Sequence, residues 1–176
     1  MSSDKRLSNA YKRAKTIAFD DSSKFILFSD CHRGDNSFAD EFANNRNIYY
    51  HALKHYFNNG FQYCELGDGD ELWENLSFEP IFEAHKNIYM LMKRFHAENR
   101  LHMIFGNHDM VYRNPAYVKK HLFTYFEPKE GKETGLLDQI QFHEAILLKH
   151  SKNGQELFLT HGHQADFMNY HGWRFN

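Results

Sequence analysis

The sequence predicts an α/β fold in which helices flank a layered and mostly parallel sheet. Short apolar segments alternate along the chain with longer segments whose apolar residues recur at helical spacing. This strand–helix order is typical of parallel strands joined by right-handed crossovers. An Asn-Gly pair between two apolar segments, at Asn153 and Gly154, predicts a hairpin. We therefore expect a second sheet to begin late in the chain and to be incomplete.

The expected parallel strands are three apolar segments at residues 24–29, 61–66 and 101–105. Between the first two, a helix is expected over residues 40–58, because its apolar residues recur on one face. This helix ends at Asn59-Gly60, two residues that accept left-handed backbone angles. A longer helix begins at Glu79-Pro80, since proline is tolerated in a first turn.

The other expected elements are a polar helix near residues 5–15, a helix over residues 114–125, and hairpin strands at 141–150 and 156–160. The chain contains no internal repeat and no low-complexity linker. We therefore expect residues 1–176 to form a single α/β domain.

The composition is ordinary for a soluble globular protein, with 41% hydrophobic and 25% charged residues. No apolar run approaches the roughly 18 residues that span a bilayer, and the first residues lack the apolar core of a signal peptide. The expected location is cytoplasmic. A net charge of −2 disfavours a nucleic-acid partner, which usually meets a basic excess. Cys31 and Cys64 lack CxxC spacing and are expected to be reduced thiols.

Polar clusters follow four of the expected strands directly. They are residues 30–35 (Asp-Cys-His-Arg-Gly-Asp), 67–71 (Gly-Asp-Gly-Asp-Glu), 106–109 (Gly-Asn-His-Asp) and 161–166 (His-Gly-His-Gln-Ala-Asp). In open α/β sheets, ligands bind just beyond the carboxyl ends of the strands. The four clusters are therefore expected to meet at one rim of the molecule.

The residue types in these clusters suit hard or borderline metal ions. Asp30 and His32 stand two apart, so in extended backbone their side chains project to the same side and can hold one ion. Asp68 has two carboxylate oxygens with which to bridge two cations, Asn107 offers an amide oxygen, and His161 offers an imidazole nitrogen. Oxygen and nitrogen ligands without thiolate favour manganese, iron or zinc.

Each cluster taken alone has an ordinary explanation. An Asp-x-His sequence is usually polar loop, and Gly-Asp after a strand is commonly a turn. Asn107 or Asp109 could cap the start of a helix, and His161-Gly162-His163 could be surface loop. The metal-site interpretation depends on all four clusters occurring in one order at successive strand ends.

Together the motifs resemble those of the calcineurin-like metallophosphoesterases. The ordered signature of that family is D-x-H, G-D-x-x-[DE], G-N-H-[DE], a strand-end His-Gly, and finally G-H-x-H. The first four are matched by Asp30-Cys31-His32, Gly67-Asp68-Gly69-Asp70-Glu71, Gly106-Asn107-His108-Asp109 and His161-Gly162. The stretch from Leu66 to Trp73 and the His-Gly-x-Gln sequence are most similar to the UDP-diacylglucosamine pyrophosphatase branch and its uncharacterised bacterial relatives.

The resemblance implies an enzyme that hydrolyses phosphomonoester, phosphodiester or pyrophosphate bonds with two divalent cations, preferentially manganese, and a water that they activate. It implies metal ligands at Asp30, His32, Asp68, Asn107 and His161. His108 would stabilise the charge that develops at the scissile phosphate or protonate the leaving oxygen, and Asp109 would orient His108. Asn107 would also meet the substrate, which is expected to be a phosphorylated small molecule.

Four residues near these motifs have roles that the sequence leaves open or assigns to packing. The Arg33 guanidinium matches phosphate geometry, and an ordinary surface salt bridge is the equal alternative. His163 is either an extra ligand or a residue beside the ligands. Trp73 is expected to pack rather than to stack on substrate. Cys31 is expected to pack, because Arg33-Gly34 is a poor match to the phosphate-cradling loop that a cysteine phosphatase needs.

One departure from the family pattern is the absence of a G-H-x-H motif after His161. We therefore expect an N-terminal fragment of a longer domain, with weak metal binding and low activity in this form. Two other functions stay open: a nuclease of the same superfamily, and a catalytically impaired metal-binding or scaffold module.

Overall fold

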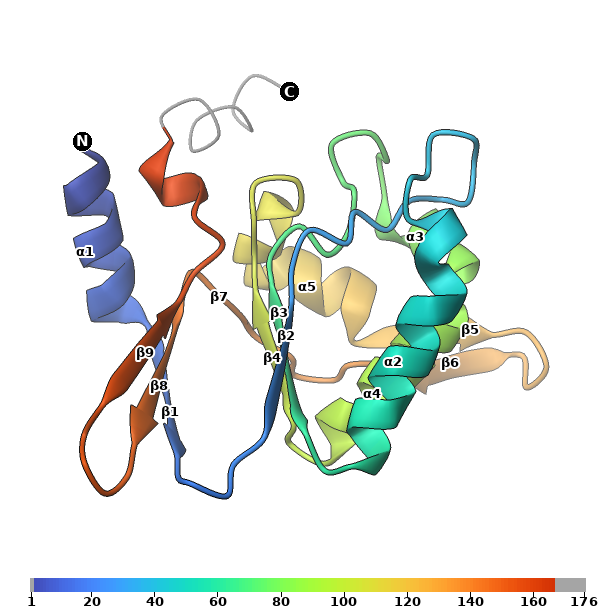
Figure 1. Ribbon diagram of the computed structural model, residues 1–176. Coiled ribbons are helices and arrows are strands. Elements are labelled where there is room, and N and C mark those ends of the chain that lie inside the picture. Colours follow the sequence, from blue (N-terminus) through green and yellow to red (C-terminus); the bar gives the residue numbers. More distant parts are fainter. Residues whose placement is uncertain (1, 167–176) are drawn as a thin grey trace.

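The computed structural model describes residues 2–166, and its centre is a parallel sheet of four short strands (Figure 1). The strand order is β2-β3-β4-β7, formed by β2 (Phe25–Phe28), β3 (Gln62–Leu66), β4 (Leu101–Ile104) and β7 (Phe142–His143). Each neighbouring pair is parallel. The carboxyl ends of all four strands therefore lie at the same edge of the sheet.

Helices cover one face of this sheet (Figure 1). They are α2 (Arg46–Asn58), α3 (Phe78–Ala84), α4 (Lys86–Ala97) and α5 (Pro115–Leu122). Their apolar faces and the sheet form the larger of two buried clusters, with Leu53, Ile88, Phe95 and Met103 each at most 2% exposed. Burying apolar side chains of this size contributes about 1.5–3 kcal/mol each, so this cluster holds the helices on the sheet.

A second sheet lies on the opposite side of the central sheet (Figure 1). Its order is β1-β8-β9, formed by β1 (Lys15–Phe19), β8 (Ile146–His150) and β9 (Glu156–Leu159). Strand β8 pairs in parallel with β1 and antiparallel with β9. A small cluster of Ile104, Ile146 and Leu148 fills the space between the two sheets. The molecule is therefore layered as helices, central sheet and second sheet.

The remaining elements within the described residues are α1 (Ser3–Arg13), the hairpin of β5 (Thr124–Glu127) and β6 (Lys132–Gly135), and three short 3-10 helices, η1 (Ala43–Asn45), η2 (Met110–Arg113) and η3 (His163–Ala165). Helix α1 lies beside η3, although the two are at opposite ends of the chain (Figure 1).

The expected α/β class and the alternation of strands and helices are confirmed, and three boundaries were wrong. The helix expected over residues 40–58 begins at Arg46, after the short helix η1. The helix expected from Glu79 is broken into α3 and α4 at His85, whose ring is fully buried and whose Nε2 lies 3.0 Å from Asp40 Oδ2. The strand expected over 141–150 is divided between the two sheets, as β7 and β8.

Three short strands were missed. The second sheet was expected to hold only a hairpin, and it also takes in β1, whose burial pattern lacks a fully buried residue. The hairpin β5–β6 occupies part of a segment assigned to the helix over 114–125 and the loop after it. No helix within residues 2–166 is both long and apolar enough to cross a membrane. The stretch after residue 166 lies outside the described residues.

Candidate metal centre

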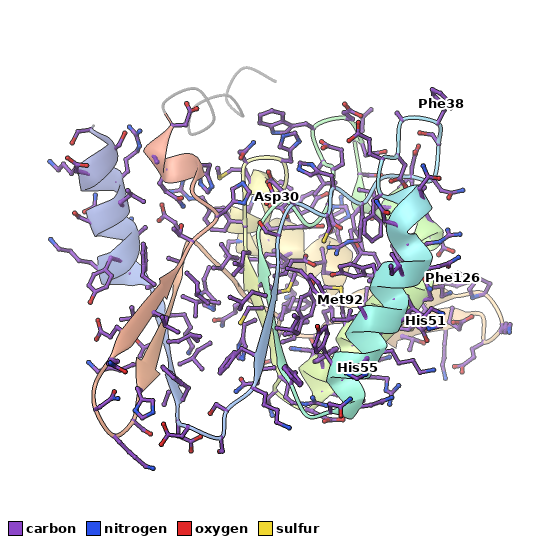
Figure 2. All side chains as sticks on the ribbon, in the orientation of Figure 1. Asp30, Phe38, His51, His55, Met92 and Phe126 are labelled. Carbon is purple, nitrogen blue, oxygen red and sulfur yellow. The ribbon has the colours of Figure 1, made fainter. Side chains whose placement is uncertain are left out.

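The predicted ligands gather at the carboxyl edge of the central sheet. Asp30 follows β2 (Figure 2), Asp68 follows β3, Asn107 follows β4, and His161 follows β9 of the second sheet. The second sheet therefore adds one side chain to a rim that is otherwise built by the central sheet.

Asp68 lies between two groups of possible ligands. Its Oδ2 is 3.1 Å from His161 Nε2 and 3.9 Å from His32 Nε2. One group contains Asp30, Asp68 and His161, and the other contains His32, Asp68 and His108; within each group the donor atoms lie within 4.8 Å of one another. Asp68 is the member that the two groups share.

The backbone at these ligands adopts angles that are rare for residues with a side chain. Asp30, His32 and Asp68 have φ values of 53°, 48° and 51°, in the left-handed region. The expectation that Asp30 and His32 lie in extended backbone was therefore wrong. Such angles are uncommon for residues other than glycine, although Asp and His adopt them more often than most, and they cluster at functional sites.

Hydrogen bonds between the first two loops enforce this backbone. The Asp30 amide donates to the Gly67 carbonyl at 3.1 Å, and the His32 amide donates to the Asp68 carbonyl at 2.9 Å. The loops after β2 and β3 thus continue the pairing of the strands beyond the end of the sheet, and the side chains of both loops are held at the rim.

Two glycines allow the loops after β3 and β4 to touch. A Cβ on Gly106 would lie 2.1 Å from Asp68 Oδ1, and a Cβ on Gly67, which has φ 97°, would lie 2.7 Å from the Gly106 nitrogen. A side chain at Gly106 would displace Asp68, and a side chain at Gly67 would push away the Gly106 backbone and His161. The close approach lets the His108 amide donate to Asp68 Oδ1 at 2.8 Å.

His161 is held in a defined orientation. Its Nδ1 lies 3.1 Å from the carbonyl oxygen of Leu66, which can only accept, so Nδ1 carries the proton. Its Nε2 lies 3.1 Å from both Asp68 Oδ2 and Asn107 Oδ1. Burial is the largest single influence and opposes protonation of this ring, but the hydrogen bond to Asp68 and the negative charges of Asp68, Asp30 and Asp109 together raise the pKa of His161. In the neutral ring, Nε2 is a free ligand atom directed at the rim.

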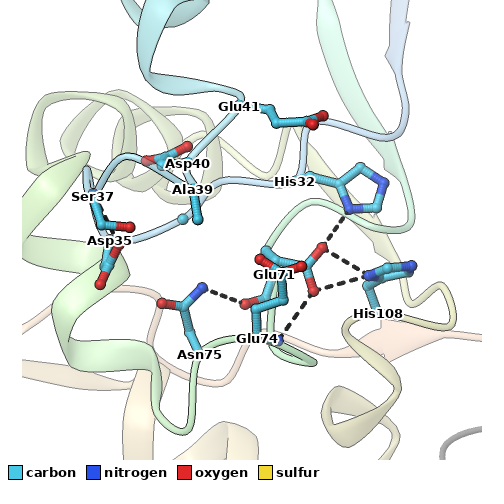
Figure 3. Close-up of a pocket in the computed structure, with 11 residues that line it drawn as sticks. His32, Asp35, Ser37, Ala39, Asp40, Glu41, Glu71, Glu74, Asn75 and His108 are labelled. Atoms are coloured by element: carbon cyan, nitrogen blue, oxygen red, sulfur yellow. Dashed lines mark hydrogen bonds and ion pairs between the residues drawn. The ribbon is translucent and has the colours of Figure 1, made fainter.

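Glu71 is the residue that sequence reasoning missed. Its Oε2 lies 2.8 Å from His32 Nδ1 and 2.7 Å from His108 Nδ1, so one carboxylate holds both imidazoles (Figure 3). Burial opposes ionisation of Glu71, but hydrogen bonds from His108 and His32 lower its pKa to about 2. The sequence did contain an indication of this role, because Glu71 occupies the acidic last position of the G-D-x-x-[DE] motif.

Asp109 does not orient His108, and that assignment is corrected. The Asp109 carboxylate is 1% exposed and accepts from the amides of Gly69 at 2.9 Å and Gly106 at 2.6 Å. Burial raises its pKa to about 7. Asp109 therefore ties the loops after β3 and β4 together, while Glu71 is the partner of His108.

Arg33 does not reach a substrate, nor does it form a surface salt bridge. Its side chain is fully buried, with Nη1 and Nη2 each 2.7 Å from the Glu65 carboxylate and Nε 2.7 Å from Asp70 Oδ1. Asp70 also accepts from the hydroxyls of Tyr89 and Tyr112, each at 2.5 Å. A guanidinium so completely paired supports the loops from below the rim.

The other nearby residues are also placed. Trp73 packs on His108 with ring centroids 4.0 Å apart and an interplanar angle of 24°. His163 is 4% exposed, its ring centroid lies 5.6 Å from that of His161, and burial lowers its pKa to about 4. Burial raises the pKa of Cys31 to about 12, so this thiol is a poor nucleophile.

Two cavities meet at His108. The first, here called the acidic cavity, has a volume of about 350 Å³ and is lined by His32, His108, Gly34, Ser37, Ala39, Asn75 and the carboxylates of Asp35, Asp40, Glu41, Glu71 and Glu74 (Figure 3). The second, here called the apolar cavity, has a volume of about 520 Å³ and is lined by Leu72, Trp73, Leu76, His108, Met110, Val111, Arg113 and Asn114. A molecule bound at the rim would have space on both sides of His108.

The donor set fits a divalent metal. Carboxylate oxygens, an amide oxygen and imidazole nitrogens converge, and the thiol of Cys31 is not among the grouped donors. Comparisons of the chain with models of known protein families, with curated proteins and with solved structures found no match.

Proposed function

We propose that this chain is a metal-dependent phosphoester hydrolase whose centre takes two divalent cations at the rim. The observation that carries the proposal is the position of Asp68, whose carboxylate is shared by two groups of donor atoms. Three of these donors, Asp30, His32 and Asp68, have left-handed backbone angles, which cluster at functional sites. The ordered motifs quoted above resemble those of metallophosphoesterases and support the same function.

One cation would be held by Asp30, Asp68 and His161, with the amide oxygen of Asn107 beside His161 Nε2. The other would be held by His32 and Asp68, and the third member of that donor group, His108, is left to the substrate. This grouping differs from the one the resemblance implies, which pairs Asp30 with His32. When bound, the cations would lower the pKa of an attacking water and neutralise phosphate oxygens.

His108 is assigned to the substrate rather than to a cation. It lines both cavities, and its side chain is 25% exposed. The Glu71 carboxylate accepts from Nδ1, so Nε2 is the nitrogen left for the substrate, and it donates to a phosphate or leaving-group oxygen when the ring carries both protons. Trp73 covers one face of the ring and restricts its rotation.

The charge around the rim makes cations necessary for this function. The acidic cavity carries five carboxylates, and none of its lining residues is a lysine or arginine. A phosphate dianion would be repelled from such a surface unless bound cations reversed the local charge. The net charge of −2 favours a phosphorylated small molecule over nucleic acid.

The test measures metal binding and hydrolysis together. Wild-type protein freed of metal with a chelator is titrated with Mn²⁺, and turnover of p-nitrophenyl phosphate and bis(p-nitrophenyl) phosphate is then followed with and without Mn²⁺. We expect two bound Mn²⁺ ions per chain and Mn²⁺-dependent release of nitrophenol from at least one ester. Binding of two ions with no turnover of either ester would favour a metal-binding module, and no binding would end the proposal.

A further inference from the structure

Helix α1 packs on the segment that follows His161. Arg6 is one of the buried residues of this helix, with 4% of its surface exposed. Its Nε donates to the Gln164 carbonyl at 2.6 Å. The hydroxyl of Ser3 donates to the Ala165 carbonyl at 2.8 Å, and it accepts from Arg6 Nη2 at 3.1 Å. Two residues of α1 thus bind the backbone of η3 directly.

Gln164 connects that contact to His161. Its side chain is fully buried, and its Oε1 accepts from the Thr160 hydroxyl at 3.1 Å and from the Gly162 amide at 3.3 Å. Thr160 and Gly162 are the residues on either side of His161. Gly162 has φ 102°, so the chain turns sharply there. The side-chain amide of Gln164 therefore holds together the turn that contains His161.

His161 needs this support more than the other ligands do. Asp30, His32 and Asp68 are held by hydrogen bonds between neighbouring loops of one sheet. His161 instead follows β9, an outer strand of the second sheet, and points across to the central sheet. A displacement of about 1 Å would separate its Nε2 from Asp68 Oδ2 beyond contact distance.

We propose that Arg6 and Gln164 are positioning residues for His161, and that α1 acts as a clamp that holds the second sheet's ligand at the rim. The inference rests on the proposed function, because it concerns a ligand of the proposed centre. Burying a guanidinium is costly unless hydrogen-bond acceptors surround it. For Arg6, one of these acceptors is the Gln164 carbonyl, which belongs to the segment that carries His161. Neither Arg6 nor Gln164 touches the cations or the substrate in this scheme.

The alternative is that Arg6 only fastens α1 to the domain. Tyr11 offers a matched control, because it fastens the same helix at its other end. Its hydroxyl donates to Glu156 Oε2 at 2.5 Å, and its ring lies 5.5 Å from that of Phe158. A purely structural role predicts that Arg6→Met and Tyr11→Leu behave alike. A positioning role predicts that only Arg6→Met disturbs His161.

The experiment compares the wild-type 176-residue chain with Arg6→Met, Arg6→Lys and Tyr11→Leu. Mn²⁺ affinity is measured by electron paramagnetic resonance titration, and the His161 ring is followed in metal-free protein by its NMR signals. For Arg6→Met we expect about tenfold or greater weakening of one Mn²⁺ site and an unchanged second site. The protected Nδ1–H signal of His161 should also be lost. Arg6→Lys, which keeps a donor, should recover part of both.

Tyr11→Leu should lower Tm while leaving Mn²⁺ affinity and the His161 signal as in wild type. The inference is overturned if the His161 signal in both Arg6 variants matches wild type, or if Tyr11→Leu shifts it equally. If wild type binds no Mn²⁺ but the His161 signal responds selectively to Arg6→Met, the proposed function fails while the positioning of His161 stands. If wild type binds Mn²⁺ and Arg6→Met binds it equally well, only the clamp fails.

Discussion

The two sheets contribute to the rim in different ways. The loops after β2, β3 and β4 are neighbours in one parallel sheet, and they bond to each other through backbone groups beyond the strand ends. The second sheet contributes His161 alone among the predicted ligands, and a helix from the other end of the chain supports it. Ligands from neighbouring parallel strands are therefore held by the sheet itself, whereas a ligand from another sheet needs a separate support.

The interiors beneath the two parts of the rim differ as well. Under the central sheet's loops lie the buried charges of Arg33, Glu65 and Asp70. Between the sheets lies a small apolar cluster with the half-buried ring of His102 at its edge, 6.5 Å from that of Phe25. The first interior depends on paired charges and the second on neutral groups, so they should respond differently to mutation and to pH.

The largest effect is expected for Asp68→Asn, which tests whether the two parts of the rim share one centre. Because Asp68 belongs to both donor groups, loss of its charge should weaken both cation sites and lower turnover by about 10³-fold or more. Turnover of p-nitrophenyl phosphate and Mn²⁺ stoichiometry are the measurements. Asp35→Asn, at an exposed carboxylate of the acidic cavity, is the control and should stay within a few fold of wild type. One cation site of unchanged affinity in Asp68→Asn would mean that the two groups are independent.

Arg33→Met should lower the free energy of unfolding by about 3–5 kcal/mol, because it leaves Glu65 and Asp70 buried under the central sheet's loops without their cation. Urea unfolding measures the change in free energy of unfolding. Arg13→Met, at an exposed position of α1, is the matched control and should change it by about 0.5 kcal/mol or less. Equal stability of the two variants would show that the buried network is not needed for the fold.

Glu71→Gln should lower turnover by about 10–100-fold, because a neutral amide holds the His32 and His108 rings less firmly. The effect should be confined to the central sheet's side, so the cation held with His161 should keep its affinity. Turnover and a two-site Mn²⁺ titration separate these outcomes. Glu74→Gln, an exposed neighbour that lines the same cavity, is the control. Weakening of both cation sites by Glu71→Gln would contradict the assignment.

The smallest effect concerns acid stability between the sheets. Burial, with His143 and Lys15 nearby, lowers the pKa of His102 to about 4. Since this is below the unfolded value of about 6.5, the unfolded chain binds the proton more readily. The contribution of neutral His102 to the free energy of unfolding is fully present above pH 6.5. It is lost as pH falls toward 4, and the loss amounts to about 1–3 kcal/mol.

His102→Gln should remove this part of the pH dependence. Free energies of unfolding at pH 7 and pH 4.5 give the measurement, and the loss on acidification should be smaller in the variant. His96, which is partly exposed and whose Nε2 bonds to the Asp138 carbonyl, provides the control as His96→Gln. An acid response in His102→Gln identical to that of wild type would place the titrating group elsewhere.

Several features could be predicted because they depend on local pattern. Apolar segments of strand length, helical periodicity and the Asn-Gly turn indicated β2, β3, β4, α2 and the β8–β9 hairpin. The metal-ligand candidates could be named because each stands directly after an apolar strand. Strand β1 escaped notice because residues 15–19 are only partly buried in the structure, so they lack the apolar pattern of a central strand.

What the sequence by itself determined was the alternation of elements and the identity of the polar residues that follow the strands, since both depend on the order of residues along the chain. The partners of those residues were decided by the tertiary structure. Arg33 was chemically suited to phosphate and is instead enclosed by Glu65 and Asp70, while Glu71 rather than Asp109 holds His108. The physical reason is that burial and hydrogen-bond geometry depend on groups about 40 residues apart in the chain, which meet only when the strands are side by side.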